Sequence, residues 1–251
     1  KSTDRDEWIG QTVTLKWGLT KSSNNISAYL MKQYGPHAMA DMMRKMGIGC
    51  HIDETYSLCV GSADIPVYDM VAAYNTFPSK GVFVTPIFVT RIEDNDGNLL
   101  GEFNNLKREA VSDYTAYLMA NLMQGVVNSG TGVRLRAKYG LKGEIAGKTG
   151  TTNDQSDGWF IGYTPSLTAG VWVGAEDRQV HFESLSLGGG SNMALPIWGL
   201  FMQKVRADGT LGVSETDRFM APPGVTLQLD CDGSDADAQV SAEEDDSYFF
   251  E

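Results

Sequence analysis

The sequence predicts an α+β fold, in which helices pack on both faces of an antiparallel β-sheet. Three strand-like runs follow one another closely, at 143–151, 158–164 and 167–174. Their connections are short and rich in Asn, Asp, Gly and Pro, which favours an antiparallel meander. Helical patterns lie before and after these runs without β-α-β alternation, so a parallel sheet is not expected.

The N-terminal part of the chain is predicted to be mainly helical. Residues 12–21 read as a short helix, 22–25 interrupt it, and helical spacing then resumes. Gly35 and Pro36 begin a methionine-rich helix that ends near Gly47. Four of its methionines recur at i, i+3, i+4 and i+7, the spacing of a buried helical face. We expect these four to pack in the core: Met39, Met42, Met43 and Met46.

The middle of the chain combines a helix and a hairpin. Residues 66–78 suit a helix with Pro66 in its first turn. Residues 82–94 alternate as a strand does, the sequence NDGN at 95–98 is typical of a hairpin turn, and 99–103 form the return strand.

Two further helices flank the predicted meander. Ser112 can cap a strongly helical segment whose end is marked by Gly130 and Gly132. After the meander, a glycine-rich loop at 187–192 leads into an apolar helix at 193–205.

Composition sets limits on the class of protein. A chain of 251 residues with 42% hydrophobic residues can bury one sizeable core. The net charge of −12 argues against nucleic acid or an anionic membrane surface as a partner.

The C-terminal end of the chain differs in charge from the rest. Residues 230–251 hold nine of the 32 acidic residues and no Lys or Arg, so we expect an acidic, disordered tail there. No run approaches the ~18 apolar residues of a membrane span, and the first residues do not resemble a signal peptide.

The cysteines and histidines indicate no metal site. Cys50, Cys59 and Cys231 lack the CxxC spacing, so they are either unrelated thiols or, in an oxidising compartment, include a Cys50–Cys59 disulfide. The three histidines are scattered along the chain, and neither a metal ion nor another cofactor is expected.

Lys148 lies between glycines in the first run of the meander. Side chains alternate along a strand, so Lys148 and Gly150 share one side while Thr149 and Thr151 share the other. The small glycines would let an extended peptide pair with this strand, where an ammonium and hydroxyls could hold a carboxylate. The alternative is an edge strand whose solvated lysine blocks aggregation.

Ser22-Ser23-Asn24 is the second candidate motif. Taken alone, Ser and Asn between helices are typical of caps and turns. A Ser-x-Asn triplet followed more than a hundred residues later by Lys-Thr-Gly is, however, part of the signature of penicillin-binding proteins and class A β-lactamases. An alternative register of the triplet begins at Ser23, but the sequence ISAYL fits better behind Ser22.

The longer segments around these motifs resemble a known family. Three segments resemble the C-terminal part of class A (bifunctional) penicillin-binding proteins of the 1A type. They are KSSNNISAYLMKQYG, KTGTTND and, shortly after it, DGWFIGYTPSLTAGVWVG. The resemblance extends almost continuously from about residue 10 to about residue 206. It implies the penicillin-binding transpeptidase fold, which serine β-lactamases share, incomplete here at its N-terminus.

The resemblance also implies a function, acyl transfer between D-Ala-D-Ala stem peptides of peptidoglycan, with β-lactams as inhibitors. Ser22 would relay a proton, and Asn24 would hold the substrate amide. Lys148 would supply positive potential near the substrate carboxylate. Thr149, Gly150 and Thr151 would bind substrate, the Thr151 N–H as an oxyanion donor. Expected partners are stem peptides, β-lactams and envelope proteins, on the periplasmic face of the cytoplasmic membrane.

One departure from the family concerns the nucleophile. No serine in the 251 residues has a lysine three positions later, as the family's Ser-x-x-Lys motif requires. We therefore expect the chain to be inactive alone, with the nucleophile, a glycosyltransferase domain and a membrane anchor lying upstream. The expected organisation is a partial transpeptidase domain at 1–206, a following segment at 207–229 and the tail at 230–251.

Two alternatives to the transpeptidase remain. The chain could be a non-catalytic peptidoglycan-binding module that has kept the docking strand and lost the nucleophile. Within the enzymes, a D,D-carboxypeptidase or a β-lactamase would use the same motifs with water as the acceptor.

Overall fold

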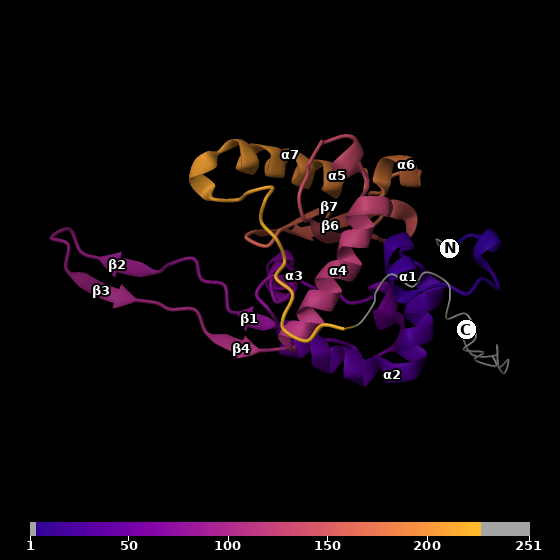
Figure 1. The fold of residues 1–251 in the computed structure, drawn as a ribbon, viewed down its shortest axis with the longest axis horizontal. Coiled ribbons are helices and arrows are strands. Elements are labelled where there is room, and N and C mark those ends of the chain that lie inside the picture. The colour runs from indigo at the N-terminus through magenta and orange to yellow at the C-terminus, as the bar shows by residue number, and fades with distance from the viewer. Residues whose placement is uncertain (1–3, 227–251) are drawn as a thin grey trace.

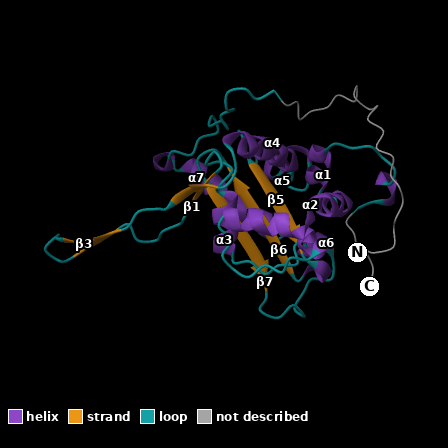
Figure 2. Cartoon of the chain, turned by 90° about the horizontal axis from the view of Figure 1, so that it is seen from below, coloured by secondary structure: helices purple, strands orange, loops and turns teal. Residues whose placement is uncertain are grey.

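The computed structural model describes residues 4–226. Its centre is a three-stranded antiparallel sheet in the order β5 (Ala146–Thr151), β6 (Asp157–Tyr163) and β7 (Thr168–Gly174) (Figure 2). The three strands follow one another along the chain, as the short connections predicted, so the meander is confirmed. The order leaves β5 at one edge of this sheet.

Helices cover both faces of the sheet, which confirms the predicted α+β class (Figure 1). On one face, α7 (Ala194–Ala207) packs through Trp198, whose ring centre lies 5.3 Å from that of Phe160. On the other face, α3 (Val67–Tyr74) approaches Gly170 so closely that a Cβ there would lie 2.5 Å from a methyl group of Val71. Both contacts bury apolar surface, which is the main source of stability in such a layered fold.

A pair of helices lies beside β5. Helix α4 (Asp113–Ser129) begins as predicted at Ser112, whose Oγ accepts a hydrogen bond from the Thr115 N–H at 3.1 Å. Helix α1 (Leu15–Lys21) packs on α4 at Gly125, where a Cβ would lie 2.5 Å from Thr20 Oγ1. Glycine at this contact lets the end of α1 come close to β5.

Helix α2 (Asn24–Lys45) is kinked at Gly35, where φ is 80° and ψ is 159°. Its second half confirms the predicted methionine-rich helix, but the predicted core stripe is half wrong. Met43 and Met46 pack on the core, whereas Met39 and Met42 are 36% and 40% exposed. Ala40 is fully buried instead, so the buried face is rotated toward the small side chain that allows the closest approach.

The predicted strand at 82–94 is also wrong as a single element. It is divided into β1 (Val82–Val84), which pairs with β4 (Lys107–Glu109), and β2 (Arg91–Glu93), which pairs with β3 (Leu99–Glu102). Pro86 lies in the break, where it cannot donate a ladder hydrogen bond.

The hairpin formed by β2 and β3 extends away from the rest of the molecule (Figure 1). Its turn is confirmed, because Asp94 Oδ1 accepts hydrogen bonds from the N–H groups of Asp96 and Asn98.

The remaining elements are short. They are η1 (Asp6–Trp8), η2 (Tyr56–Val60), α5 (Arg134–Ala137), η3 (Asn153–Gln155), α6 (Leu185–Gly188) and η4 (Gly209–Leu211). Within residues 4–226, no helix combines the length and the apolar character that crossing a bilayer requires.

The cysteines are only partly covered by the structure. Cys50 and Cys59 are separate thiols, both packed against the cluster around α2. The expected tail at 230–251 and Cys231 lie outside the described residues.

Candidate active site

Lys148 and Ser22 meet although 126 residues separate them in the chain. The Lys148 ammonium lies 2.6 Å from Ser22 Oγ, and it also donates to the main-chain oxygen of Thr149 at 3.0 Å. The lysine comes from the edge strand β5, and the serine comes from the turn between α1 and α2. The two candidate motifs therefore form one site.

The turn at Ser22 has a specific backbone geometry. The Ser23 N–H donates to Gly18 O at 2.9 Å, and the Ser22 N–H donates to Leu19 O at 3.2 Å. This pair of bonds is the Schellman motif, which normally ends a helix with glycine in the left-handed region. Ser22 takes that position with φ 58° and ψ 46°, so the chain keeps a hydroxyl where glycine would be less strained.

Lys148 is half-buried, and its ammonium is poorly hydrated. Loss of hydration lowers the pKa of its ammonium from 10.5 to about 8. Among the described residues no carboxylate lies within ion-pair distance of it, so hydrogen-bond acceptors alone offset its charge. The geometry contradicts the alternative of a solvated, aggregation-blocking lysine.

The ladder between β5 and β6 determines which main-chain groups of β5 are available. Lys148 lies opposite Ile161 and Thr149 opposite Phe160, and the Thr152 N–H donates to Asp157 O. In an antiparallel ladder every second residue bonds to the partner strand. Residues 148 and 150 therefore face β6, while the N–H and C=O groups of Thr149 and Thr151 point to the open edge.

The threonine hydroxyls make contacts of their own on the face opposite Lys148. Thr149 Oγ1 lies 2.7 Å from Thr131 Oγ1, and Thr151 Oγ1 accepts a hydrogen bond from the Gly190 N–H at 2.9 Å. The main chain of Gly190 also lies against the main chain of Gly150, because a Cβ added to Gly190 would lie 2.1 Å from Gly150 O. The glycine-rich loop thus supports the strand on one side.

Asn24 and Ser23 occupy the start of α2. Ser23 is buried and caps this helix, since its Oγ accepts from the Ile26 N–H at 3.3 Å. Asn24 is the first helical residue and is half-buried. The contact with Lys148 is made by Ser22, and no hydrogen bond joins Asn24 to Lys148. In the described chain, no group of His, Cys, Asp and Glu side chains is arranged to hold a metal ion.

The turn after α4 was missed as part of the site. Thr131 contacts Thr149, and a Cβ on Gly130 would lie 2.3 Å from Thr20 O. The turn therefore touches both the strand of Lys148 and the helix that ends at Ser22. Two glycines flanking one threonine in the sequence GTG are the signal that could have indicated a close backbone approach.

The Lys-Thr-Gly motif on an edge strand thus faces the Ser-x-Asn turn, and these two motifs belong to the signature of penicillin-binding proteins. The comparison with protein families agrees. The model described as penicillin binding protein transpeptidase domain matches residues 1–179, and the chain belongs to this family.

Similar curated proteins carry the name penicillin-binding protein 1A. The protein of Aquifex aeolicus is 32% identical over 200 residues, which are 80% of this chain and 27% of that protein. The protein of Clostridium acetobutylicum is 35% identical over 218 residues, 85% of this chain and 25% of that protein. The chain thus spans about a quarter of the length of these relatives.

Solved structures show the same fold. Penicillin-binding protein 1A from Haemophilus influenzae superimposes with a TM-score of 0.73 at 20% identity, covering 89% of this chain and 39% of that chain. The PonA1 protein from Mycobacterium tuberculosis, solved in complex with penicillin V, gives a TM-score of 0.66 at 24% identity, covering 82% of this chain and 59% of that chain.

Proposed function

We propose that this chain forms one wall of the active site of a peptidoglycan D,D-transpeptidase. The observation that carries the proposal is the 2.6 Å contact between Lys148 and Ser22 beside the open edge of β5. Family membership and the names of the relatives support it. The substrates would be D-Ala-D-Ala stem peptides. β-Lactams would acylate the nucleophilic serine, which is not Ser22 and which the 251 residues do not contain.

The open edge of β5 would bind the donor peptide. An extended chain can add to an edge strand through main-chain hydrogen bonds, here to the outward groups of Thr149 and Thr151. The Thr151 N–H would stabilise the oxyanion, and the hydroxyls of both threonines would hold the terminal carboxylate. Gly150 would leave room for the backbone of the substrate.

Lys148 and Ser22 would act on the leaving group. As the oxygen of the nucleophilic serine bonds to the penultimate carbonyl carbon, its hydroxyl loses a proton, the amide C–N bond breaks and the departing D-Ala nitrogen needs a proton. Ser22 would deliver a proton to that nitrogen, and the proton released by the nucleophile would return to Ser22 through Lys148. Asn24 would hydrogen-bond the amide of the donor peptide. An amine of a second peptide would then attack the ester carbonyl of the acyl-enzyme and form the amide cross-link. The ester C–O bond breaks, and the proton lost by the amine returns to the nucleophilic serine.

The nucleophile itself has to come from outside the 251 residues, because no Ser-x-x-Lys occurs in them. We propose residues 1–206 as part of the transpeptidase domain, followed by a segment at 207–229 and the tail at 230–251. The longer protein would also carry a glycosyltransferase domain and an N-terminal membrane anchor. It would work on the periplasmic face of the cytoplasmic membrane, where envelope proteins could bind it.

The experiment is labelling of the whole gene product, including the codons upstream of Lys1, with a fluorescent penicillin. We expect covalent labelling that is lost when Lys148 is replaced by Gln. A stem-peptide donor should then give a cross-linked product when an amine acceptor competes with water.

Three results would contradict the proposal. Release of D-Ala with water as the only acceptor would indicate a carboxypeptidase, and rapid hydrolysis of the penicilloyl-enzyme would indicate a β-lactamase. Reversible peptide binding without labelling would indicate a non-catalytic binding module.

A further inference from the structure

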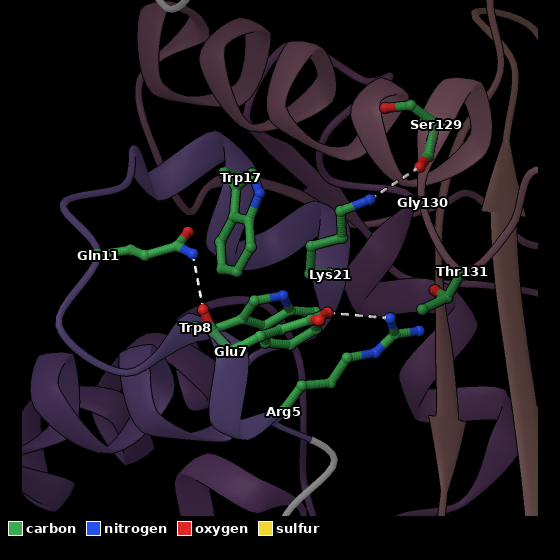
Figure 3. Close-up of a pocket in the computed structure, with 9 residues that line it drawn as sticks. All are labelled: Arg5, Glu7, Trp8, Gln11, Trp17, Lys21, Ser129, Gly130 and Thr131. Carbon is green, nitrogen blue, oxygen red and sulfur yellow. Dashed lines mark hydrogen bonds and ion pairs between the residues drawn. The ribbon is translucent and has the colours of Figure 1, made fainter.

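A cavity of about 670 Å³ lies between the N-terminal segment and the turn after α4 (Figure 3). Its walls come from three parts of the chain: η1 and the residues around it, helix α1, and residues 129–131. Among the lining residues are Arg5, Glu7, Trp8, Trp17, Lys21 and Thr131. This volume suits a small ligand or a few residues of a peptide.

The cavity adjoins the candidate active site without including Ser22 or Lys148. Lys21 immediately precedes Ser22 in the chain, and Thr131 is the residue that contacts Thr149. A peptide paired with the edge of β5 could therefore extend a further segment into the cavity.

The charges on the walls leave one cation available. Arg5 and Glu7 form an ion pair at 3.2 Å, so their charges offset each other. Lys21 Nζ donates only to the main-chain oxygen of Ser129, at 3.5 Å, and within residues 4–226 no carboxylate lies within ion-pair distance of it (Figure 3). A carboxylate that enters the cavity could therefore form a charge-assisted hydrogen bond with this ammonium.

Two aromatic side chains lie on the walls near Lys21, Trp17 on the same helix and Trp8 on η1, and both are held in place. Trp8 and Trp17 make an edge-to-face contact with ring centres 4.9 Å apart. The Trp17 N–H donates to Thr14 Oγ1 at 3.1 Å, which caps α1. Asp4 accepts a hydrogen bond from the Asn25 N–H at 2.9 Å, which ties the N-terminal segment to the start of α2. Both aromatic side chains are thus positioned before any ligand arrives, which lowers the entropic cost of binding.

We propose that this cavity is a subsite for a carboxylate-bearing segment of the peptide substrate, with Lys21 binding the carboxylate and Trp8 and Trp17 packing against the peptide's apolar part. The inference rests on the proposed function for the identity of the peptide. It adds a specificity-determining residue, Lys21, that would distinguish free from amidated stem peptides.

The test is binding of two probes to the whole gene product, measured by isothermal titration calorimetry. One probe is a stem-peptide fragment with a free side-chain carboxylate that lacks the reactive D-Ala-D-Ala end, and the other is the same fragment with that carboxylate amidated. We expect the acidic probe to bind more tightly than the amidated one. Lys21→Gln should weaken the acidic probe roughly tenfold and leave the amidated probe unchanged.

Two further variants make the test specific. Lys21→Arg should restore most of the preference for the acidic probe, because it keeps a cation. Lys107→Gln, which removes a lysine on the exposed strand β4, should change neither affinity. The inference would be overturned if Lys21→Gln weakened the binding of both probes equally, or if it weakened the binding of neither. The absence of binding by the intact protein would also overturn it, and would indicate that another segment fills the cavity.

Fluorescent penicillin labelling of the same preparations tests the proposed function separately. Labelling without a preference for the acidic probe would leave the transpeptidase proposal intact and refute the subsite. A Lys21-dependent preference without labelling would support the subsite and refute the enzyme.

Discussion

Ser22 contacts Lys148 from a backbone conformation that glycine would adopt more easily. A non-glycine residue in the left-handed region costs roughly 1 kcal/mol, and such strain is found most often at functional sites. The serine hydroxyl lies 2.6 Å from an ammonium whose pKa is lowered to about 8. At this scale the site combines a hydroxyl acceptor on a strained backbone with a poorly hydrated cation.

Replacing Ser22 by Gly distinguishes the contribution of the hydroxyl to activity from the effect of the backbone strain on stability. Ser22→Gly should keep the Schellman turn and change the free energy of unfolding by no more than about 1 kcal/mol, in the stabilising direction. Acylation by a β-lactam should nevertheless fall on the order of 10²-fold, because proton relay is lost. Urea unfolding and stopped-flow labelling of the whole gene product measure the two effects.

Ser22→Ala is the matched control for this change. It removes the same hydroxyl but keeps the backbone strain, so it should lose as much activity as Ser22→Gly while being less stable. Full activity in either variant would contradict the relay.

Lys148 should give the acylation rate a pH dependence. The ammonium is the form that attracts a carboxylate, and with a pKa of about 8 it is lost as the pH rises through that value. The second-order rate of β-lactam acylation should therefore decrease above about pH 8. In Lys148→Arg this decrease should be absent, because guanidinium stays charged. A rate that rises through pH 8 would instead assign the neutral amine as a base.

The lowered pKa of Lys148 also predicts that the stability of the fold changes with pH. Between about pH 8 and pH 10.5 the unfolded chain binds more protons at Lys148 than the folded chain, so the free energy of unfolding should rise with pH in that window. The cost of the poorly hydrated ammonium, roughly 3 kcal/mol, is fully present below about pH 8. In Lys148→Gln this part of the rise should be missing from urea unfolding curves measured at pH 7.5 and 10.

At the scale of elements, the turn after α4 determines how the two walls of the site meet. Gly130 lets this turn approach the main chain of Thr20, and Thr131 reaches Thr149 on β5. The contact between Ser22 and Lys148 joins side chains of two separate elements, and the turn touches both of those elements. Its hydrogen bond to Thr149 also orients a hydroxyl that the proposed mechanism uses.

Thr131→Val tests this hydrogen bond with a side chain of nearly the same shape. The Thr149 hydroxyl loses its partner, so we expect KM for a stem-peptide donor to rise about fivefold to tenfold with a smaller change in kcat. Thr131→Ser should restore the wild-type values, because it keeps the hydroxyl. Equal defects in the Ser and Val variants would show that Thr131 acts only by packing.

Gly130→Ala tests the close approach of the main chains. A Cβ would lie 2.3 Å from Thr20 O, so the turn or α1 has to move, and we expect a loss of about 1–3 kcal/mol in the free energy of unfolding. Gly49→Ala is the matched control, because a Cβ at Gly49 meets no atom within 4 Å and should change stability little. Equal stability of the two variants would refute the packing argument.

The sequence predicted the individual helices and turns better than it predicted how they pack on one another. Ser112 and the turn around Asp94 were recognisable because their hydrogen bonds are made to nearby residues. The exposure of Met39 was not predictable, since the buried face of a helix depends on the elements that pack on it. The site shows the same limit: the strand with Lys148 was predictable, whereas its approach to Ser22 across 126 residues followed only from the resemblance to a family.

At the scale of the whole molecule, the layers around the three-stranded sheet hold the site, and the β2–β3 hairpin lies apart from them (Figure 1). The largest buried side chains lie around the sheet and α7, among them Trp198, Tyr163 and Phe160. The hairpin instead exposes apolar side chains: Leu99 and Leu100 are 52% and 67% exposed. An isolated two-stranded hairpin is only marginally stable in water, so it contributes little to the stability of the body.

Removing the hairpin should therefore leave the body intact. The Phe103 N–H already donates to Thr90 O at 2.9 Å, so residues 91–102 can be replaced by Gly-Gly, which closes a two-residue turn. We expect the free energy of unfolding in urea to change by less than about 1 kcal/mol and β-lactam labelling to stay at the wild-type rate. Solubility should increase, because exposed apolar surface is removed. A loss of more than about 2 kcal/mol would show that the hairpin packs on the body and stabilises the site.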